Sequence, residues 1–149
     1  MKTQLLLLSL LIAPALQAQN IIHADVQVTH LEPETSALAW QRVNLHTPKY
    51  PIELAQAGVR GCGVFKVQVD SKGNTESVEL INAVPKKGLA KSARKLIKRW
   101  KWQPNTGKGA AQPDPEQPML IRLDFCMGGE SAEEATARCR VQAQYNCAE

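Results

Sequence analysis

The sequence predicts an α+β fold, a two-layer sandwich in which helices cover one face of a three-stranded antiparallel sheet. Three segments, 62–70, 75–84 and 119–126, alternate apolar and polar residues at the period of two that is typical of half-buried strands. Between the second and the third, apolar residues recur at helical spacing from Leu89 to Trp100. Strand, strand, helix, strand is an order typical of small two-layer domains.

The connections between these segments predict how the strands are ordered. The turn SKGN contains Gly73, which suits the positive φ of a tight hairpin, so the first two strands should pair antiparallel. A helix then leads to the third strand, and a right-handed crossover leaves room for the first strand between the other two. The expected order is therefore 2-1-3. A short helix that begins at Pro51 and stops near Gly58 should precede the first strand.

The chain divides into four parts. Residues 1–18 contain a lysine, a leucine-rich run and small residues before an expected cleavage site, which is the pattern of a secretory signal peptide. Residues 19–47 are an N-terminal extension, in which ADVQVTHLE indicates only a weak strand. Residues 48–126 form the domain, and residues 127–149 form a disulfide-tied tail. We expect an exported protein, soluble after signal peptide cleavage, with no stable membrane insertion.

Cysteines in an exported chain favour disulfide bonds, and this chain has an even number of them: Cys62, Cys126, Cys139 and Cys147. The 2-1-3 order brings Cys62 beside Cys126 on the face away from the helix, so we expect a bridge between them. SAEE, from Ser131, resembles a capping box and predicts a short tail helix, tied down by a bridge from Cys139 to Cys147. Other pairings stay open, since four cysteines allow three arrangements.

The charge is modest overall but uneven. The formal net charge is +4, and the stretch from Lys86 to Lys101 holds eight basic residues and no acid. Such a patch can meet phosphates, anionic lipid or an acidic partner, but an exported protein rarely meets nucleic acid. The sequence S-x-x-K at Ser92 lacks the companion motifs of the penicillin-interacting enzymes, and the histidines have no ligand spacing. We expect no enzyme activity, no metal and no cofactor.

Four motifs resemble the C-terminal domain of TonB: KYPIELAQAGVRG, GCGVFKVQVDSKGN, INAVP and RWKWQP. The resemblance covers roughly residues 48–125 and implies a periplasmic, energy transducer-like binding module that engages outer-membrane transporters. It also implies that the tryptophans of RWKWQP are structural, although a binding role for them is the alternative. The transmembrane helix and proline-rich spacer of a full TonB are not recognisable, so we expect a stand-alone member. The motif residues are Tyr50, Pro51, Gly61, Gly73, Trp100, Trp102 and Pro104.

In that family the third strand is an exposed sheet edge to which a transporter segment adds as a further strand. Arg122 and Asp124 should point outward there, either to select the partner or to discourage aggregation. The tail could also cover this edge, and a homodimer through the edges stays open. The expected edge consists of Met119, Leu120, Ile121, Arg122, Leu123, Asp124 and Phe125.

A second hypothesis gives the sheet only a scaffolding role. In it the protein is an envelope-surface protein whose basic helix binds anionic lipid or cell-wall polymer. The two hypotheses predict different salt dependence, because salt screens charges but hardly affects strand addition.

Overall fold

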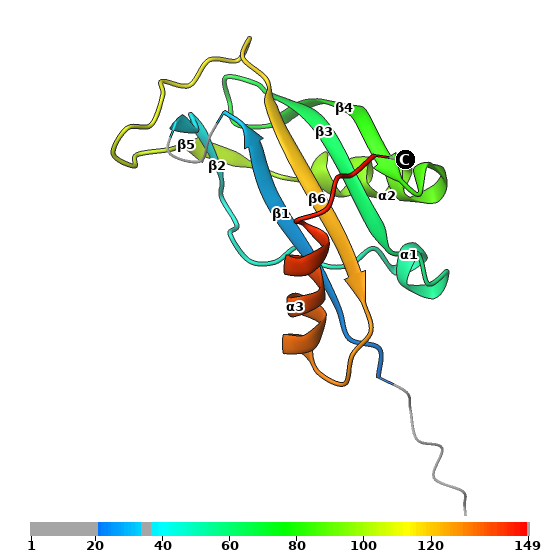
Figure 1. Cartoon of the computed structure of the whole chain (residues 1–149). Coiled ribbons are helices and arrows are strands. Elements are labelled where there is room, and N and C mark those ends of the chain that lie inside the picture. Colours follow the sequence, from blue (N-terminus) through cyan, green and yellow to red (C-terminus); the bar gives the residue numbers. More distant parts are fainter. Residues whose placement is uncertain (1–20, 34–36, 149) are drawn as a thin grey trace, which may run out of the picture.

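The protein is built around a four-stranded antiparallel sheet, shown by a computed structural model that describes residues 21–33 and 37–148 (Figure 1). The strand order is β1-β6-β3-β4, and a separate two-stranded sheet pairs β2 with β5. The strands are β1 (Ala24–Glu32), β2 (Trp40–Arg42), β3 (Gly61–Val69), β4 (Thr75–Val84), β5 (Trp102–Pro104) and β6 (Met119–Met127). The expected signal peptide lies outside the described residues.

The prediction of a three-stranded sheet is wrong by one strand. The weakly predicted segment from Ala24 to Glu32 pairs antiparallel with β6, from Ala24 opposite Met127 to Glu32 opposite Leu120. Its alternation supplies Val26 to the core, opposite Phe125 of β6. β3 pairs with β4 on one side and with β6 on the other.

Helices cover both faces of the sheet, not one. The helices are α1 (Ile52–Gln56), α2 (Lys86–Ile97) and α3 (Ala132–Gln142). α2 lies behind the sheet in Figure 1 and contacts α1, while α3 lies in front of β1 and β6. The fold is therefore three layers where two were predicted, because the C-terminal tail folds back across the second face.

The main core lies between the sheet and α2. Phe65 and Val67 of β3 and Ile121 and Leu123 of β6 are completely buried there, and Leu89 of α2 packs with them. Each such side chain contributes roughly 1.5–3 kcal/mol by leaving water. These are the positions that the alternating pattern assigns to one face, which confirms the prediction of which side chains in β3 and β6 point into the core.

Local signals define the turns and helix ends. The Asp70 carboxylate accepts hydrogen bonds from the backbone N–H groups of Lys72 and Asn74, both at 2.8 Å, and Gly73 has a φ of 76°. Ser131 Oγ accepts a hydrogen bond from the N–H of Glu134 at the start of α3, which confirms the predicted tail helix.

No helix in the described ranges combines the length and apolarity needed to span a bilayer.

Candidate partner-binding surface

β6 is not the exposed edge that the resemblance implied. It pairs with β3 on one side from Met119 to Phe125, and with β1 on the other side from Leu120 to Met127. The prediction of this edge is wrong because the N-terminal extension supplies a strand that occupies it. The tail, which was the alternative cover, lies on the face of the sheet and not along the edge of β6 (Figure 1).

Arg122 and Asp124 face away from α2, as the alternation indicates, but neither is available to a partner. Asp124 is completely buried, and two hydrogen bonds of 2.8 Å join it to the Arg122 guanidinium. Arg122 also donates to the carbonyl oxygens of Gln142 and Tyr145, at 3.0 and 2.6 Å. The pair therefore attaches the C-terminal tail to β6, and the predicted exposed position of these two charges is wrong.

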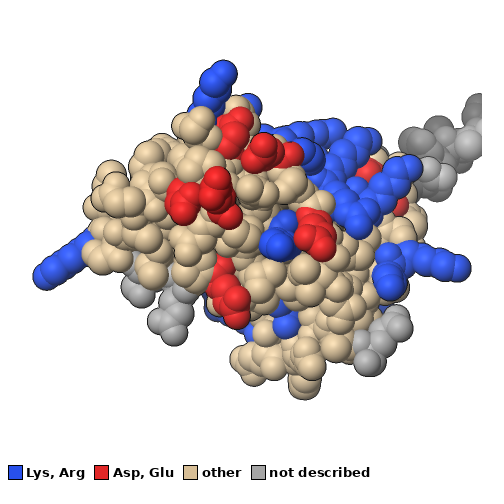
Figure 2. Space-filling view, turned by 90° about the horizontal axis from the view of Figure 1, so that it is seen from above, with Lys and Arg blue, Asp and Glu red and all other residues tan. Residues whose placement is uncertain are grey.

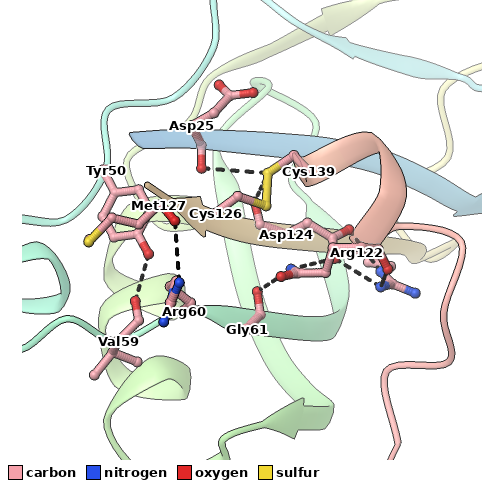
Figure 3. The surroundings of a disulfide bond; sticks show 11 residues. Asp25, Tyr50, Val59, Arg60, Gly61, Arg122, Asp124, Cys126, Met127 and Cys139 are labelled. Carbon is pink, nitrogen blue, oxygen red and sulfur yellow. Dashed lines mark hydrogen bonds and ion pairs between the residues drawn. A yellow bond between two sulfur atoms is a disulfide. The ribbon is translucent and has the colours of Figure 1, made fainter. Parts of the chain in front are cut away.

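The disulfide pairing differs from the prediction in both bonds. Cys126 is bonded to Cys139 of α3, with Cα atoms 5.4 Å apart (Figure 3), and Cys62 is bonded to Cys147, with Cα atoms 5.8 Å apart. Cys62 lies opposite Asp124 in the sheet and so is two residues out of register with Cys126. The tail crosses this face and offers one sulfur to each strand, so the two strands are joined to the tail and not to one another.

The motif residues of the resemblance occupy structural positions. Tyr50 Oη donates to the carbonyl of Val59 at 2.6 Å (Figure 3). The Tyr50 ring meets the Phe125 ring edge-on, with centroids 5.6 Å apart. Burial raises the pKa of Tyr50 to about 12. A side chain at Gly61 would put Cβ 1.8 Å from the carbonyl oxygen of Val84, so only glycine fits there.

The two tryptophans lie beyond the last turn of α2 and differ in burial. Trp102 is buried in β5, and its Nε1 donates to Thr75 Oγ1 at 2.9 Å. Trp100 is half-buried and meets Trp102 edge-on at 5.9 Å. The helix ends at Ile97, and Pro104 lies in β5.

The outer edge of β1 is the part of the sheet that is open to another strand. The carbonyl of His23 accepts from the N–H of Gly128, at 2.9 Å, so in an antiparallel ladder the backbone groups of every second residue from there face β6. The groups of the alternate residues, Val26 and Val28 among them, therefore point outward. Within the described ranges, no hydrogen bond from another segment reaches those outward groups.

The opposite edge of the sheet, along β4, is partly occupied. Lys98 Nζ donates to the carbonyl oxygens of Thr75 and Glu76 at the start of this strand. At the other end, the Asn82 side chain donates to the carbonyl of Cys147, at 2.7 Å, which attaches the C-terminal tail to β4 without using a backbone group of the strand. The contrast favours β1 over β4 as a site for strand pairing.

A groove of about 300 Å³ runs beside the open edge of β1. One wall is β1 itself, from Asp25 to Val28, and the other is the segment before α1, which contributes Leu45 and Pro48. Arg42 and Arg140 also line it, so the groove has cationic side chains as well as a row of backbone groups. Sequence reasoning missed this site because it treated 19–47 as an extension without a defined role.

Basic side chains gather on one part of the surface (Figure 2). α2 and the residues after it hold the predicted acid-free run, and Lys91, Arg94 and Lys95 are exposed along the helix. Among the described residues there is no group of three or more His, Cys, Asp or Glu side chains that could hold a metal ion.

Comparison with known proteins relates part of the chain to a protein family. The family model described as "Gram-negative bacterial TonB protein C-terminal" matches residues 46–118. This part of the chain belongs to the TonB C-terminal family. Two relatives, each named Protein TonB and from two strains of Xanthomonas campestris pv. campestris, are 32% identical over 66 residues. That match covers 44% of this chain and 30% of each relative, so less than a third of the relatives' length is represented.

A solution NMR structure of the Pseudomonas aeruginosa TonB CTD aligns with 62% of this chain and 89% of its own, at 16% identity and a TM-score of 0.38. The TonB C-terminal match itself contains α1, β3, β4, α2 and β5 and stops at Pro118, immediately before β6. β1, β6 and α3, which form the open edge and the disulfide-bonded layer, therefore lie outside the matched segment.

Proposed function

We propose that this protein is a non-enzymatic, periplasmic binding module with a TonB-like role in transport across the outer membrane. The family match over residues 46–118 supports the role, and the sheet supplies a means of binding. The partner would be an outer-membrane transporter or a segment of another envelope protein.

The mode we propose is addition of an extended partner segment to the outer edge of β1. The observation that carries it is the row of outward backbone groups along β1, beside the groove that Leu45 and Pro48 also line. Backbone pairing would supply affinity, and the groove would select side chains. Pairing with β6 instead would require β1 to leave, breaking the register that runs from Ala24 to Glu32.

A proline substitution separates these modes. Val28→Pro removes an outward N–H at an edge position, where proline is tolerated, and Val28→Ala is the matched control because it shortens the side chain but keeps the N–H. Each oxidised protein would be immobilised and exposed to outer-membrane extract, with circular dichroism to verify folding and mass spectrometry to identify captured proteins. A photo-crosslinking residue at Leu45, beside the groove, would locate the captured segment.

The expected result is capture of a β-barrel transporter by the parent and by Val28→Ala, with capture by folded Val28→Pro reduced about tenfold. The crosslinked segment should be extended and should belong to the transporter. Equal capture by Val28→Pro would place the partner elsewhere, with displacement of β1 as the next mode to test. Failure of every variant to capture an envelope protein would contradict the binding function.

The basic run of α2 supports a second candidate, an envelope-surface protein that binds anionic lipid or cell-wall polymer. Its binding to phosphatidylglycerol vesicles should fall steeply between low and physiological salt, because the exposed lysines are screened. Transporter capture through strand pairing should change little over the same range.

A further inference from the structure

A second concave site lies between the segment 42–49 and the end of α2. Its volume is about 620 Å³, and its lining includes the apolar side chains of Pro48, Leu96 and Trp100. Its cationic side chains come from separate elements, and no Asp or Glu is among the described residues that line it. The cations are Arg42, Lys49, Arg99 and Lys101.

Arg42 is the unusual member of this set. Its guanidinium carbon lies 4.6 Å from the centroid of the Trp100 ring, and the side chain is half-buried. Burial lowers the pKa of the Arg42 guanidinium, so the charge is costly where it stands. Within the described ranges the ion pairs are Lys66 with Glu79 and Arg122 with Asp124, so Arg42 has no carboxylate partner there.

The surroundings hold Arg42 in place. Trp100 is supported by its edge-on contact with Trp102, which is in turn hydrogen-bonded to Thr75. The N–H of Val43 donates to the carbonyl of Lys101, at 2.9 Å, and ties β2 to the chain that follows α2. A guanidinium that lies over the face of an aromatic ring keeps the N–H groups at its edge free, ready for two parallel hydrogen bonds to an oxyanion.

We infer that this pocket binds the carboxylate of an acidic peptide segment, with Arg42 as the bidentate partner. Lys49, Arg99 and Lys101 strengthen the attraction from the rim, and the apolar lining accepts a neighbouring apolar side chain of the peptide. The planar fork of arginine matches a carboxylate. A membrane surface is flat and cannot enter a concave site to reach a half-buried guanidinium, whereas a single extended chain can. The inference does not depend on strand addition at β1.

The test uses the oxidised full chain and a defined probe, the blocked tetrapeptide Ac-Leu-Asp-Glu-Leu-NH2, with Ac-Leu-Asn-Gln-Leu-NH2 as its uncharged match. Arg42→Gln removes the guanidinium. Arg94→Gln is the matched control, because Arg94 is exposed on α2, does not line the pocket and carries the same charge. Backbone amide shifts in NMR titrations would report both the affinity and the place of binding.

We expect the acidic peptide to shift resonances of Val43, Trp100 and Lys101, and its uncharged match to shift none of them. Arg42→Gln should weaken binding about tenfold, and Arg94→Gln by less than about twofold. Arg42→Lys keeps the charge and the long side chain but loses the fork, so it should fall between them and serves if Arg42→Gln does not fold.

Three results would overturn the inference. Equal weakening by Arg42→Gln and Arg94→Gln would show diffuse attraction to the basic surface and no defined site. Binding of inorganic phosphate or phosphatidylglycerol vesicles without binding of the acidic peptide would assign the pocket to another anion. Equal binding of the two peptides would show that the carboxylates are not recognised.

Discussion

Arg122 and Asp124 illustrate how little a single alternating position reveals about exposure. Their place in β6 puts both on the face opposite α2, as the sequence indicates, yet they are 7% and 0% exposed. Gln142 Nε2 donates to Asp124 Oδ1 at 2.9 Å, and the tail carbonyls accept from Arg122, so the pair has its hydrogen-bond partners within the protein. Buried charges need such pairing, because an unpaired one is strongly destabilising.

His30 predicts a pH dependence of stability. Burial, and secondarily the nearby positive charge of Arg42, lowers the pKa of His30 from its ordinary value of 6.5. The folded protein therefore binds this proton less readily than the unfolded chain does. The resulting stability is complete above pH 6.5 and is lost as the pH falls through the lowered pKa.

Urea unfolding between about pH 8 and pH 5 checks this prediction. The midpoint of the parent should fall on acidification, and His30→Gln should reduce that fall. His46→Gln is the matched control, since the His46 side chain is exposed. The unfolding midpoint of this variant should fall on acidification as much as that of the parent. A parental slope that His30→Gln does not alter would contradict the assignment.

At the scale of elements, the hairpin of β3 and β4 is specified by residues within its own turn. Asp70 closes the turn, and the positive φ of Gly73 brings the backbone against β5, where the N–H of Trp102 donates to the carbonyl of Gly73 at 2.8 Å. β1 has no comparable local signal. It becomes a strand because β6 offers it a long edge to pair with.

Gly73→Ala should be strongly destabilising. A Cβ at this position would lie 2.2 Å from the carbonyl oxygen of Trp102, in addition to the strain of a positive φ, so we expect a loss of about 3 kcal/mol or more in the free energy of unfolding. Gly58→Ala is the matched control, since φ there is 63° but the added Cβ meets nothing within 4 Å. Its loss should be about 1 kcal/mol, from strain alone. Equal losses for the two variants in urea unfolding would show that the backbone at Trp102 shifts to accommodate the added Cβ.

At the scale of the whole molecule, the C-terminal tail converts two layers into three. α3 rests on β1 and β6, and each disulfide joins the tail to a different strand of the sheet. The bond from Cys126 to Cys139 closes a sequence separation of 13, and the bond from Cys62 to Cys147 closes one of 85. The longer closure restricts the unfolded chain more.

Removing the two disulfides separately should therefore give unequal losses. In the chain-entropy account, Cys62→Ala with Cys147→Ala should cost about 4.5 kcal/mol, and Cys126→Ala with Cys139→Ala about 3 kcal/mol. Both double variants exchange two buried cysteines for alanine, so each is the other's control. Urea unfolding measures both. A larger loss for the shorter closure would show that local attachment of α3 outweighs the restriction of the unfolded chain.

The sequence by itself determined the features that depend on neighbouring residues. Alternation identified the core faces of β3 and β6, Gly73 identified the hairpin, Ser131 identified the start of α3, and the four motifs indicated the family. The tertiary structure decided what covers each strand: β1 occupies the edge of β6, the tail buries Arg122 and Asp124, and the cysteines pair with α3 and the C-terminus. Periodicity is a local property that tells which way a side chain points, whereas the segment that it meets depends on contacts between distant parts of the chain.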